Sequence, residues 1–109
     1  MSCLMIDVAS LSLDSNDIKR ISHPLVGGVI LFSRNYENKK QLKLLVKSIR
    51  KIKHNILIAV DHEGGRVQRF RDDFTQLPAM ALLGSLFDKD PDEATRIAKL
   101  CGWVIAKEL

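Results

Sequence analysis

The sequence predicts an α/β fold built on a parallel sheet. Residues 3–8, 26–32 and 56–60 form three short runs that are apolar nearly throughout and do not alternate with polar residues. Continuous apolar runs are typical of parallel strands covered on both faces. Helical patterns separate the runs, and strands that alternate with helices indicate βα units. With 46% hydrophobic and 28% charged residues, the chain has the composition of a globular domain and not of a disordered segment.

The first two strands and the helix between them come from residues 3–32. CLMIDV at 3–8 predicts a short, fully buried strand. A capping residue at 14–16 begins a helix that runs to Ile21, and it ends before Pro24 because the residue preceding a proline is disfavoured in the α conformation. VGGVILF at 26–32 predicts the second buried strand.

The most regular helical pattern follows at residues 39–53. Its apolar residues recur at positions i, i+3, i+4 and i+7, with lysines on the opposite face: Leu42, Leu45, Val46, Ile49 and Ile52. ILIAV at 56–60 predicts a third buried strand, and a turn-rich segment extends from there to about Pro78.

Two helices complete the prediction. Residues 79–87 have the composition of a short helix. Asp90 and Pro91 begin another that continues to the end of the chain, because proline and acidic residues suit the first turn of a helix. Trp103 falls on its apolar side, so we expect this ring in the core.

Doubly wound sheets and β/α barrels both fit this order of elements. No GxGxxG follows the first strand and no phosphate-binding P-loop motif occurs, so nucleotide binding has no fingerprint here. The barrel is therefore favoured, and in barrels the active site is built at the carboxyl ends of the strands. Five apolar side chains are expected to point into such a barrel: Ile6, Val29, Leu31, Leu57 and Ala59.

Charge and cysteine usage exclude several classes of function. Seven Lys and Arg residues lie between Lys39 and Lys53 without an acid, which predicts a solvated helix face, with an anion-binding surface as the alternative. Aromatic residues are not interleaved with them, so we expect no nucleic-acid partner. Cys3 and Cys101 have no metal-binding spacing, which argues against zinc or a disulfide framework. With no signal peptide or apolar span, we expect a cytoplasmic protein without a membrane partner.

Each predicted strand is followed by polar residues. Asp7 follows the first strand, Ser33-Arg34-Asn35 the second and Asp61-His62-Glu63 the third. A carboxylate at the end of a buried strand needs partners, and the hydroxyl groups of a sugar-like ligand can supply several. Instead of a ligand, Asp61 could have Arg66 or Arg69 as its partner, in an ion pair that orders the loop. Asp7 is a candidate for holding the loop after the first strand.

The segment after Asp61 allows similar alternatives. Gly64 and Gly65 permit positive φ, either in a tight turn or for close approach of the backbone to a ligand. Arg66 and Arg69 are candidates for binding oxygens of a ligand or a carboxylate. His62 is a candidate general base, although no nucleophile is apparent beside it.

Five segments carry a resemblance to a known family. They are "MIDV", "HPLVGGVILFSRNY", "QLKLLVKSIR", "AVDHEGGRVQRFRDDFTQLPAM" and "GWVIAKEL", in this order along the whole chain. Together they resemble the bacterial β-N-acetylglucosaminidases of glycoside hydrolase family 3 that act in peptidoglycan recycling. The DHEGGRVQRF segment is specific for this family, although many members have glutamine at the position of His62.

The resemblance implies a fold, a substrate and a site. It implies that residues 1–109 form the N-terminal part of a (β/α)8 TIM-type barrel, incomplete in this chain. The enzymes of the family remove terminal N-acetylglucosamine from muropeptides with retention of configuration, and the resemblance implies no cofactor and no metal. By similarity, Asp61 binds hydroxyl groups of this sugar, and Arg69 lies against the same N-acetylglucosamine. The paired glycines let the loop pass beneath the sugar ring.

The resemblance also implies what these residues do not supply. The family's nucleophilic aspartate and histidine acid/base belong to motifs that have no counterpart in residues 1–109. We therefore expect no catalytic residue in this chain, and no activity from it alone. The alternatives are a non-catalytic sugar-binding remnant, or half of a split enzyme whose partner is a complementing C-terminal half.

Overall fold

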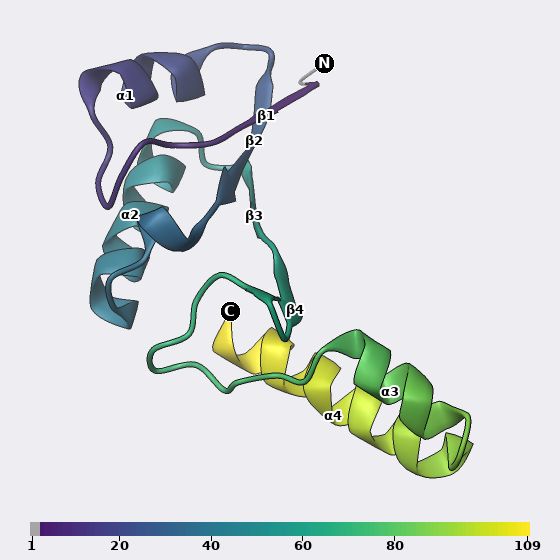
Figure 1. Cartoon of the computed structure of the whole chain (residues 1–109). Coiled ribbons are helices and arrows are strands. Elements are labelled where there is room, and N and C mark those ends of the chain that lie inside the picture. Colours follow the sequence, from purple (N-terminus) through teal and green to yellow (C-terminus); the bar gives the residue numbers. More distant parts are fainter. Residues whose placement is uncertain (1–2) are drawn as a thin grey trace. The chain divides into compact units, whose positions relative to one another are not determined.

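The structure is a computed structural model that describes residues 3–109. The chain folds into two compact parts, the first ending at Asp61 and the second running from His62 to Leu109 (Figure 1). The boundary falls directly after the third strand of the parallel sheet. It therefore separates the βα units from the loop and helices that follow them.

The first part is a βαβαβ unit around a three-stranded parallel sheet. The strands lie in the order β1-β2-β3, so β2 is central. The elements in chain order are β1 (Leu4–Ile6), α1 (Ser15–Ser22), β2 (Val26–Leu31), the short 3₁₀ helix η1 (Ser33–Asn35), α2 (Lys39–Ile52) and β3 (Leu57–Val60). The predicted strands, helices and parallel pairing are confirmed.

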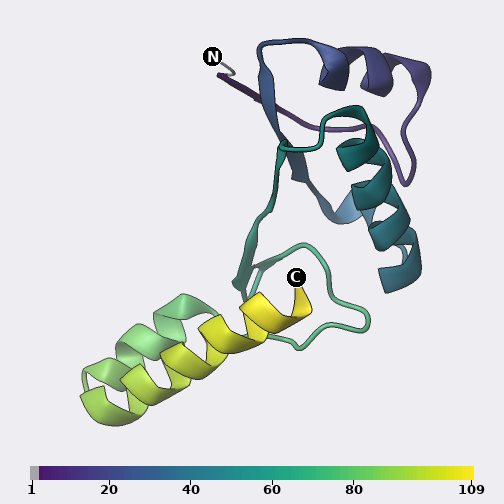
Figure 2. The same cartoon turned by 180° about the vertical axis from the view of Figure 1, so that it is seen from behind.

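Both helices cover the same face of this sheet (Figures 1 and 2). Val29 and Leu31 of β2 are fully buried on that face, together with Leu45 and Ile49 of α2. The register pairs Val29 with Ile6 and with Ile58. Because side chains alternate along a strand, neighbours in register lie on the same face, which places Ile6 on the helix face as well.

The prediction that five side chains point into the barrel, away from the helices, is therefore wrong for three of them. Ile6, Val29 and Leu31 point toward the helices, whereas Leu57 and Ala59 lie on the opposite face in register with Gly28 and Ile30. The sequence alone could not show which face each residue occupies, because polar and apolar residues do not alternate in a continuous apolar run.

The prediction that all three strands are fully buried is also wrong for the outer two. The exposed fraction is 48% for Leu4 and 46% for Met5 in β1, and 60% for Leu57 in β3. On the face away from the helices, Met5 lies over Gly28, where an added Cβ would come within 2.7 Å of the Met5 Cε atom. Only β2 has a neighbouring strand on both sides among residues 3–109, and its side chains are correspondingly buried.

Helix α1 begins and ends where the sequence predicts. Asp14 caps it, accepting a hydrogen bond from the Asp17 backbone N–H at 2.7 Å, while the Asp17 carboxylate reaches back to the Asp14 N–H at 3.4 Å. This reciprocal capping box satisfies two amide groups that would otherwise lack partners. The helix stops at Ser22, and His23 before Pro24 is in the extended conformation.

Helix α2 presents most of its basic residues to solvent, as predicted. Asn38 caps its first turn by accepting from the Gln41 N–H at 2.9 Å. Lys53, directly after the helix, differs from the rest: its Nζ donates to the His23 carbonyl at 2.9 Å and to the Val26 carbonyl at 2.6 Å. This one cation ties the end of α2 to the start of β2.

The second part contains a small hairpin and two helices. The hairpin strands β4 (His62–Gly64) and β5 (Val67–Gln68) are antiparallel. The helices α3 (Met80–Phe87) and α4 (Pro91–Glu108) were both predicted, and they lie side by side (Figures 1 and 2). The hairpin was not predicted: its strands are two and three residues long and show no apolar alternation, and its turn consists of Gly65 and Arg66.

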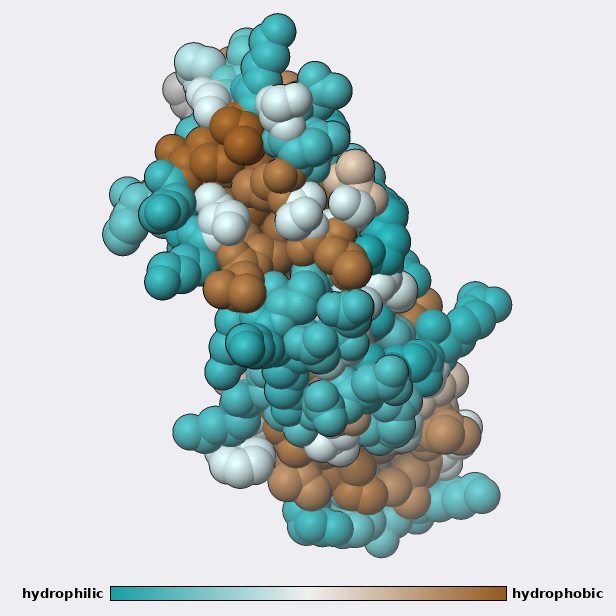
Figure 3. Space-filling model, turned by 90° about the vertical axis from the view of Figure 1, so that its left-hand side faces the viewer, coloured by the Kyte–Doolittle hydropathy of each residue, from teal (hydrophilic) through white to brown (hydrophobic). Residues whose placement is uncertain are grey.

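The two helices of the second part leave large apolar side chains at the surface. Ala94 and Cys101 of α4 are buried, but Trp103 is 60% exposed, so its predicted place in the core is wrong in this structure. Leu82 and Phe87 of α3 are also more than half exposed. Figure 3 shows one face of the molecule on which hydrophobic residues reach the surface, and exposed apolar patches are typical of surfaces that associate.

We expect the isolated chain to be marginally stable and to self-associate. Burial of one large apolar side chain contributes about 1.5–3 kcal/mol, against roughly 5–15 kcal/mol for a whole domain. Size-exclusion chromatography and thermal unfolding should therefore show oligomers and a low Tm. The double variant Leu82→Lys/Trp103→Lys should elute at a smaller size. A wild-type monomer that unfolds cooperatively above about 65 °C, the upper end for mesophilic domains, would contradict this expectation.

Candidate functional site

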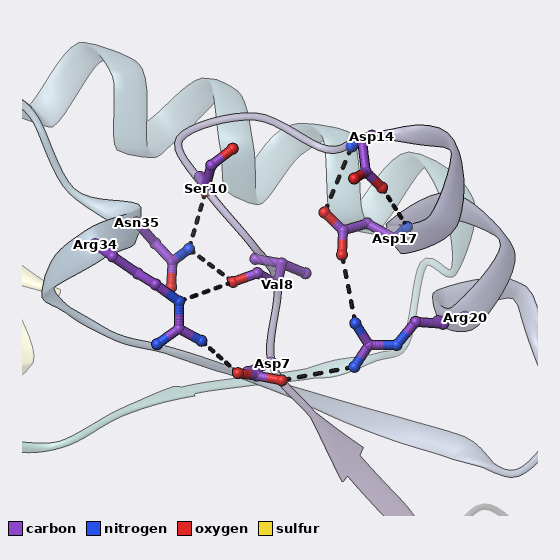
Figure 4. A network of polar contacts seen from close by, with 8 residues as sticks. All are labelled: Asp7, Val8, Ser10, Asp14, Asp17, Arg20, Arg34 and Asn35. Carbon is purple, nitrogen blue, oxygen red and sulfur yellow. Dashed lines mark hydrogen bonds and ion pairs between the residues drawn. The ribbon is translucent and has the colours of Figure 1, made fainter.

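A cluster of polar residues forms where β1 and β2 end (Figure 4). Arg34 of η1 forms an ion pair with Asp7, which follows β1, and its Nε donates to the Val8 carbonyl at 3.3 Å. Its guanidinium also lies 4.8 Å from the centre of the Phe32 ring. Arg34 therefore fastens the loop after β1 to the loop after β2, and Asp7 has the structural role that the sequence suggested.

Asn35 is the buried member of this cluster. Its Nδ2 donates to the carbonyls of Val8 at 3.1 Å and Ser10 at 2.9 Å, and its Oδ1 accepts from the Phe32 N–H at 2.9 Å. The side chain is fully buried, and all these bonds go to backbone groups of the two loops. Sequence reasoning placed Asn35 in a polar loop but did not identify this role, for which an asparagine directly after a strand gives no specific signal.

Asp7 and Asp17 share a second cation, Arg20 of α1. The Arg20 guanidinium lies 3.5 Å from Asp7 and 3.6 Å from Asp17. The side chains of Asp7, Arg20 and Arg34 are each nearly half exposed, and exposed ion pairs contribute only about 0–1 kcal/mol each. The cluster thus fixes the geometry of the strand ends more than it stabilises the fold.

Asp61 lies at the same end of the sheet as this cluster. Val60 is in register with Leu31, so Asp61 follows β3 at the level at which Phe32 follows β2. Its side chain is half-buried. The structure thus places Asp61 where the active sites of β/α barrels are built, and its binding of a sugar stays a prediction.

In the second part, the backbone conformation and the packing of the hairpin both require glycine at positions 64 and 65. Gly64 and Gly65 have φ of +84° and +56°, which side chains other than glycine rarely adopt. A Cβ on Gly64 would lie 2.3 Å from the Pro78 carbonyl oxygen, and one on Gly65 would lie 2.7 Å from the Ala79 Cβ. The turn and the close approach of residues 77–79 therefore account for both glycines, and their predicted approach to a sugar ring stays untested.

Gln68 holds the long loop that follows the hairpin. Its buried amide donates to the carbonyls of Phe70 at 3.1 Å and Thr75 at 2.9 Å, and accepts from the Leu77 N–H at 3.0 Å. Arg71 adds bonds to Gln76 at 2.9 Å and to the Gly65 carbonyl. Sequence analysis did not identify either residue, because their partners lie in an irregular loop and most of them are backbone groups.

The two arginines that the sequence offered as candidates for binding oxygens differ in environment. Arg66 lies in the exposed turn, whereas Arg69 is half-buried directly after β5. Arg69 is therefore the better placed of the two to be held in one orientation, as the resemblance requires of a residue that contacts sugar.

His62 is enclosed by aromatic rings and not open to a substrate. Its ring centre lies 6.2 Å from that of Phe70 and 5.7 Å from that of Phe74. Its Nδ1 is buried and has no hydrogen-bond partner among residues 3–109. Burial lowers the pKa of His62 below its ordinary value, Glu108 partly opposes this effect, and Arg71 adds to it. A neutral, packed imidazole fits a core residue better than the general base considered from the sequence.

The described residues provide neither a cluster of metal-ligating side chains nor a membrane-spanning helix. Residues 3–109 contain no group of three His, Cys, Asp or Glu side chains that could hold a metal ion. None of the helices among them is both long and apolar enough to cross a membrane.

Comparison with known proteins gives the chain its family. Residues 4–109 match the family described as "Glycosyl hydrolase family 3 N terminal domain". The chain belongs to glycosyl hydrolase family 3. Its parallel βαβαβ unit is accordingly the first part of this family's β/α barrel, as the sequence predicted.

Similar members of family 3 are bacterial enzymes. The chain is 53% identical over 107 residues to a beta-hexosaminidase of Methylobacillus flagellatus and 55% identical over 108 residues to one of Bordetella pertussis. Each comparison covers 97% of this chain but only 31% of the relative. The chain thus spans about a third of the length of these family 3 proteins.

Solved structures of family 3 members give the same result. Native NagZ from Neisseria gonorrhoeae matches with a TM-score of 0.83 and 44% identity, over 94% of this chain and 30% of that protein. The same protein in complex with N-trifluoroacetyl-D-glucosamine matches with a TM-score of 0.81 and 44% identity, over the same shares of the two chains.

The buried His62 predicts how the stability of this family 3 chain depends on pH. Its pKa is lower in the folded than in the unfolded state, so the unfolded state binds more protons as the pH falls. The free energy of unfolding should therefore decrease as the pH drops through about 6.5, the ordinary value for histidine, and level off below the pKa of the folded state.

Unfolding by urea between about pH 8 and pH 5 would measure this dependence. His62→Gln should flatten the curve over this range, whereas the matched variant His54→Gln should leave it unchanged because His54 is exposed. Equal slopes in the wild type and His62→Gln would show that His62 does not carry the effect.

Proposed function

We propose that residues 1–109 are the N-terminal portion of the catalytic barrel of a retaining β-N-acetylglucosaminidase. In the complete enzyme, Asp61 and Arg69 hold the terminal N-acetylglucosamine of a muropeptide. The nucleophile and the acid/base come from residues outside this range, since a retaining glycosidase needs both on opposite sides of the scissile bond. The enzyme acts in the cytoplasm, in peptidoglycan recycling.

The observation that carries this proposal is the position of Asp61. It is a half-buried carboxylate at the carboxyl end of β3, beside the strand ends that Arg34 and Asn35 hold together. A carboxylate can accept several hydrogen bonds, which suits the adjacent hydroxyl groups of a sugar ring. The similarity to beta-hexosaminidases supports this ligand class, as does the complex of NagZ from Neisseria gonorrhoeae with an N-acylated glucosamine.

The chain by itself should not hydrolyse glycosides. General acid–base catalysis contributes roughly 10²–10⁴-fold, and the covalent route also needs its nucleophile. Incubation of residues 1–109 with a chromogenic N-acetylglucosaminide should release no more chromophore than a heat-denatured sample. Release clearly above that background would place catalytic groups within this chain.

The sugar-binding roles of Asp61 and Arg69 can be tested in a complete barrel, made by joining residues 1–109 to the uncovered portion of the Neisseria gonorrhoeae enzyme. Loss of hydrogen bonds to the sugar costs about 1–3 kcal/mol, so Asp61→Ala should lower kcat/KM by about 5- to 150-fold. Arg69→Met should have an effect of the same order.

Matched variants control for effects on folding. Asp88→Ala and Arg66→Met remove the same charges from exposed positions, and they should leave kcat/KM within about twofold of the wild type. If folded Asp61→Ala keeps the wild-type kcat/KM, the carboxylate has the purely structural role that the sequence left open.

A further inference from the structure

The ring of His62 packs against two residues of the loop that follows the hairpin. Its centre lies 6.2 Å from that of Phe70 and 5.7 Å from that of Phe74, and the two phenyl rings are 5.7 Å apart. Aromatic rings at these separations attract one another. All three residues are buried, and the His62 Nδ1 has no hydrogen-bond partner among residues 3–109. Packing, and not a hydrogen bond at this nitrogen, therefore holds the ring.

Across the hairpin, His62 lies opposite Gln68. The register of β4 and β5 pairs the two residues, and side chains of directly opposite residues in antiparallel strands are neighbours on one face. Gln68 is buried, and its amide binds backbone groups of Phe70, Thr75 and Leu77. His62 thus adjoins both the residue that holds the loop and one of the residues that are held.

Arg69 is the residue between these two neighbours of His62. It is half-buried, whereas Gln68 before it and Phe70 after it are almost completely buried. Because both flanking side chains are packed, the backbone of Arg69 has little freedom to shift. Positioning of this kind matters for a residue that contacts a substrate, since a misplacement of about 1 Å can cost on the order of 10²-fold in rate.

We propose that His62 is a positioning residue, whose ring braces Gln68 and Phe70 and thereby holds Arg69 in place for the sugar. His62 touches neither the sugar nor the reacting atoms, and it acts through Arg69. The proposal rests on the proposed function in taking Arg69 as a sugar contact. It adds the side chain on which this contact depends.

Hydrogen exchange tests the bracing itself, without a sugar. The Leu77 N–H donates to the Gln68 Oε1 at 3.0 Å, so its exchange rate reports the position of Gln68. The protein is the complete barrel made by joining residues 1–109 to the uncovered portion of the Neisseria gonorrhoeae enzyme. There, His62→Ala should speed this exchange by at least about tenfold, because local opening becomes easier. Unchanged exchange in folded His62→Ala would overturn the proposal.

The conservative variant His62→Gln should rescue the bracing. Its planar amide has nearly the size of the imidazole and can occupy the same space, so exchange of the Leu77 amide should stay within about threefold of the wild type. A rate as fast as that of His62→Ala would show that a planar side chain of this size does not brace the loop, contrary to the proposal.

A double-mutant cycle in the same barrel measures the coupling to Arg69. Alone, His62→Ala should lower kcat/KM by about 3- to 30-fold, mostly through a higher KM, since a displaced Arg69 binds the sugar less well. In the Arg69→Met background, the same substitution should have less than about a twofold further effect, because the side chain that it positions is gone. Equal losses in the two backgrounds would show that His62 does not act through Arg69.

A matched variant controls for stability. Ile49→Val removes one carbon from a fully buried residue of α2, in the first part of the chain. It should lower the Tm but leave Leu77 exchange and kcat/KM within about twofold. If it changed both as much as His62→Ala does, the effect would be one of stability and the proposal would be wrong. Should His62→Ala fail to fold, His62→Val replaces it with the same criteria.

The two readouts separate this proposal from the proposed function. Faster Leu77 exchange in His62→Ala, together with an unchanged kcat/KM in Arg69→Met, would support the bracing and count against the sugar contact. A lower kcat/KM in Arg69→Met, together with wild-type exchange and kcat/KM in folded His62→Ala, would count against the positioning role alone.

Discussion

The parallel pairing of β2 with both of its neighbours is the constraint on which the rest of the first part depends. β2 is the one strand among residues 3–109 with partners on both sides, and its register sets which side chains of β1 and β3 face the helices. Val29 and Leu31 are fully buried against the helix layer as a result. The same register brings the carboxyl ends of all three strands to one edge of the sheet.

The loops at that edge are held by backbone-directed bonds from two adjacent residues. Asn35 uses both ends of its amide on the loops after β1 and β2, while Arg34 adds an ion pair to Asp7. Because buried amides must be satisfied, loss of either loop conformation would leave one end of the Asn35 amide without its partners. This arrangement holds the loops after β1 and β2 in place at the end of the sheet where Asp61 lies, and preorganised surroundings of this kind suit the sugar contact proposed for Asp61.

In the second part, side chains hold a long loop that has little regular secondary structure of its own. Gln68 and Arg71 supply the hydrogen bonds that strand or helix partners would otherwise make. Phe70, Phe74 and His62 form an aromatic cluster within the same part of the chain. The segment DHEGGRVQRF therefore consists largely of residues that shape the loop. Among its members, Asp61 and Arg69 carry the proposed contact with ligand.

The sequence by itself determined the order of elements, because caps, apolar periodicity and prolines act on near neighbours. Asp14 begins α1, Asp90 and Pro91 begin α4, and the three apolar runs became parallel strands. It also determined the family and placed Asp61 at a strand end, since both follow from the order of residues along the chain.

Only the tertiary structure decided which apolar residues are covered and which polar residues hold the loops. Val29 and Leu57 look alike in sequence, but Val29 is fully buried on the face that the helices cover and Leu57 faces away from them, because the register across the strands assigns the faces. Asn35, Gln68 and Lys53 gained their roles from backbone carbonyls of other segments, up to 27 residues away for Asn35 and 30 for Lys53. Trp103 lies on an apolar stripe and yet is exposed, because burial depends on a neighbouring surface that local sequence cannot specify.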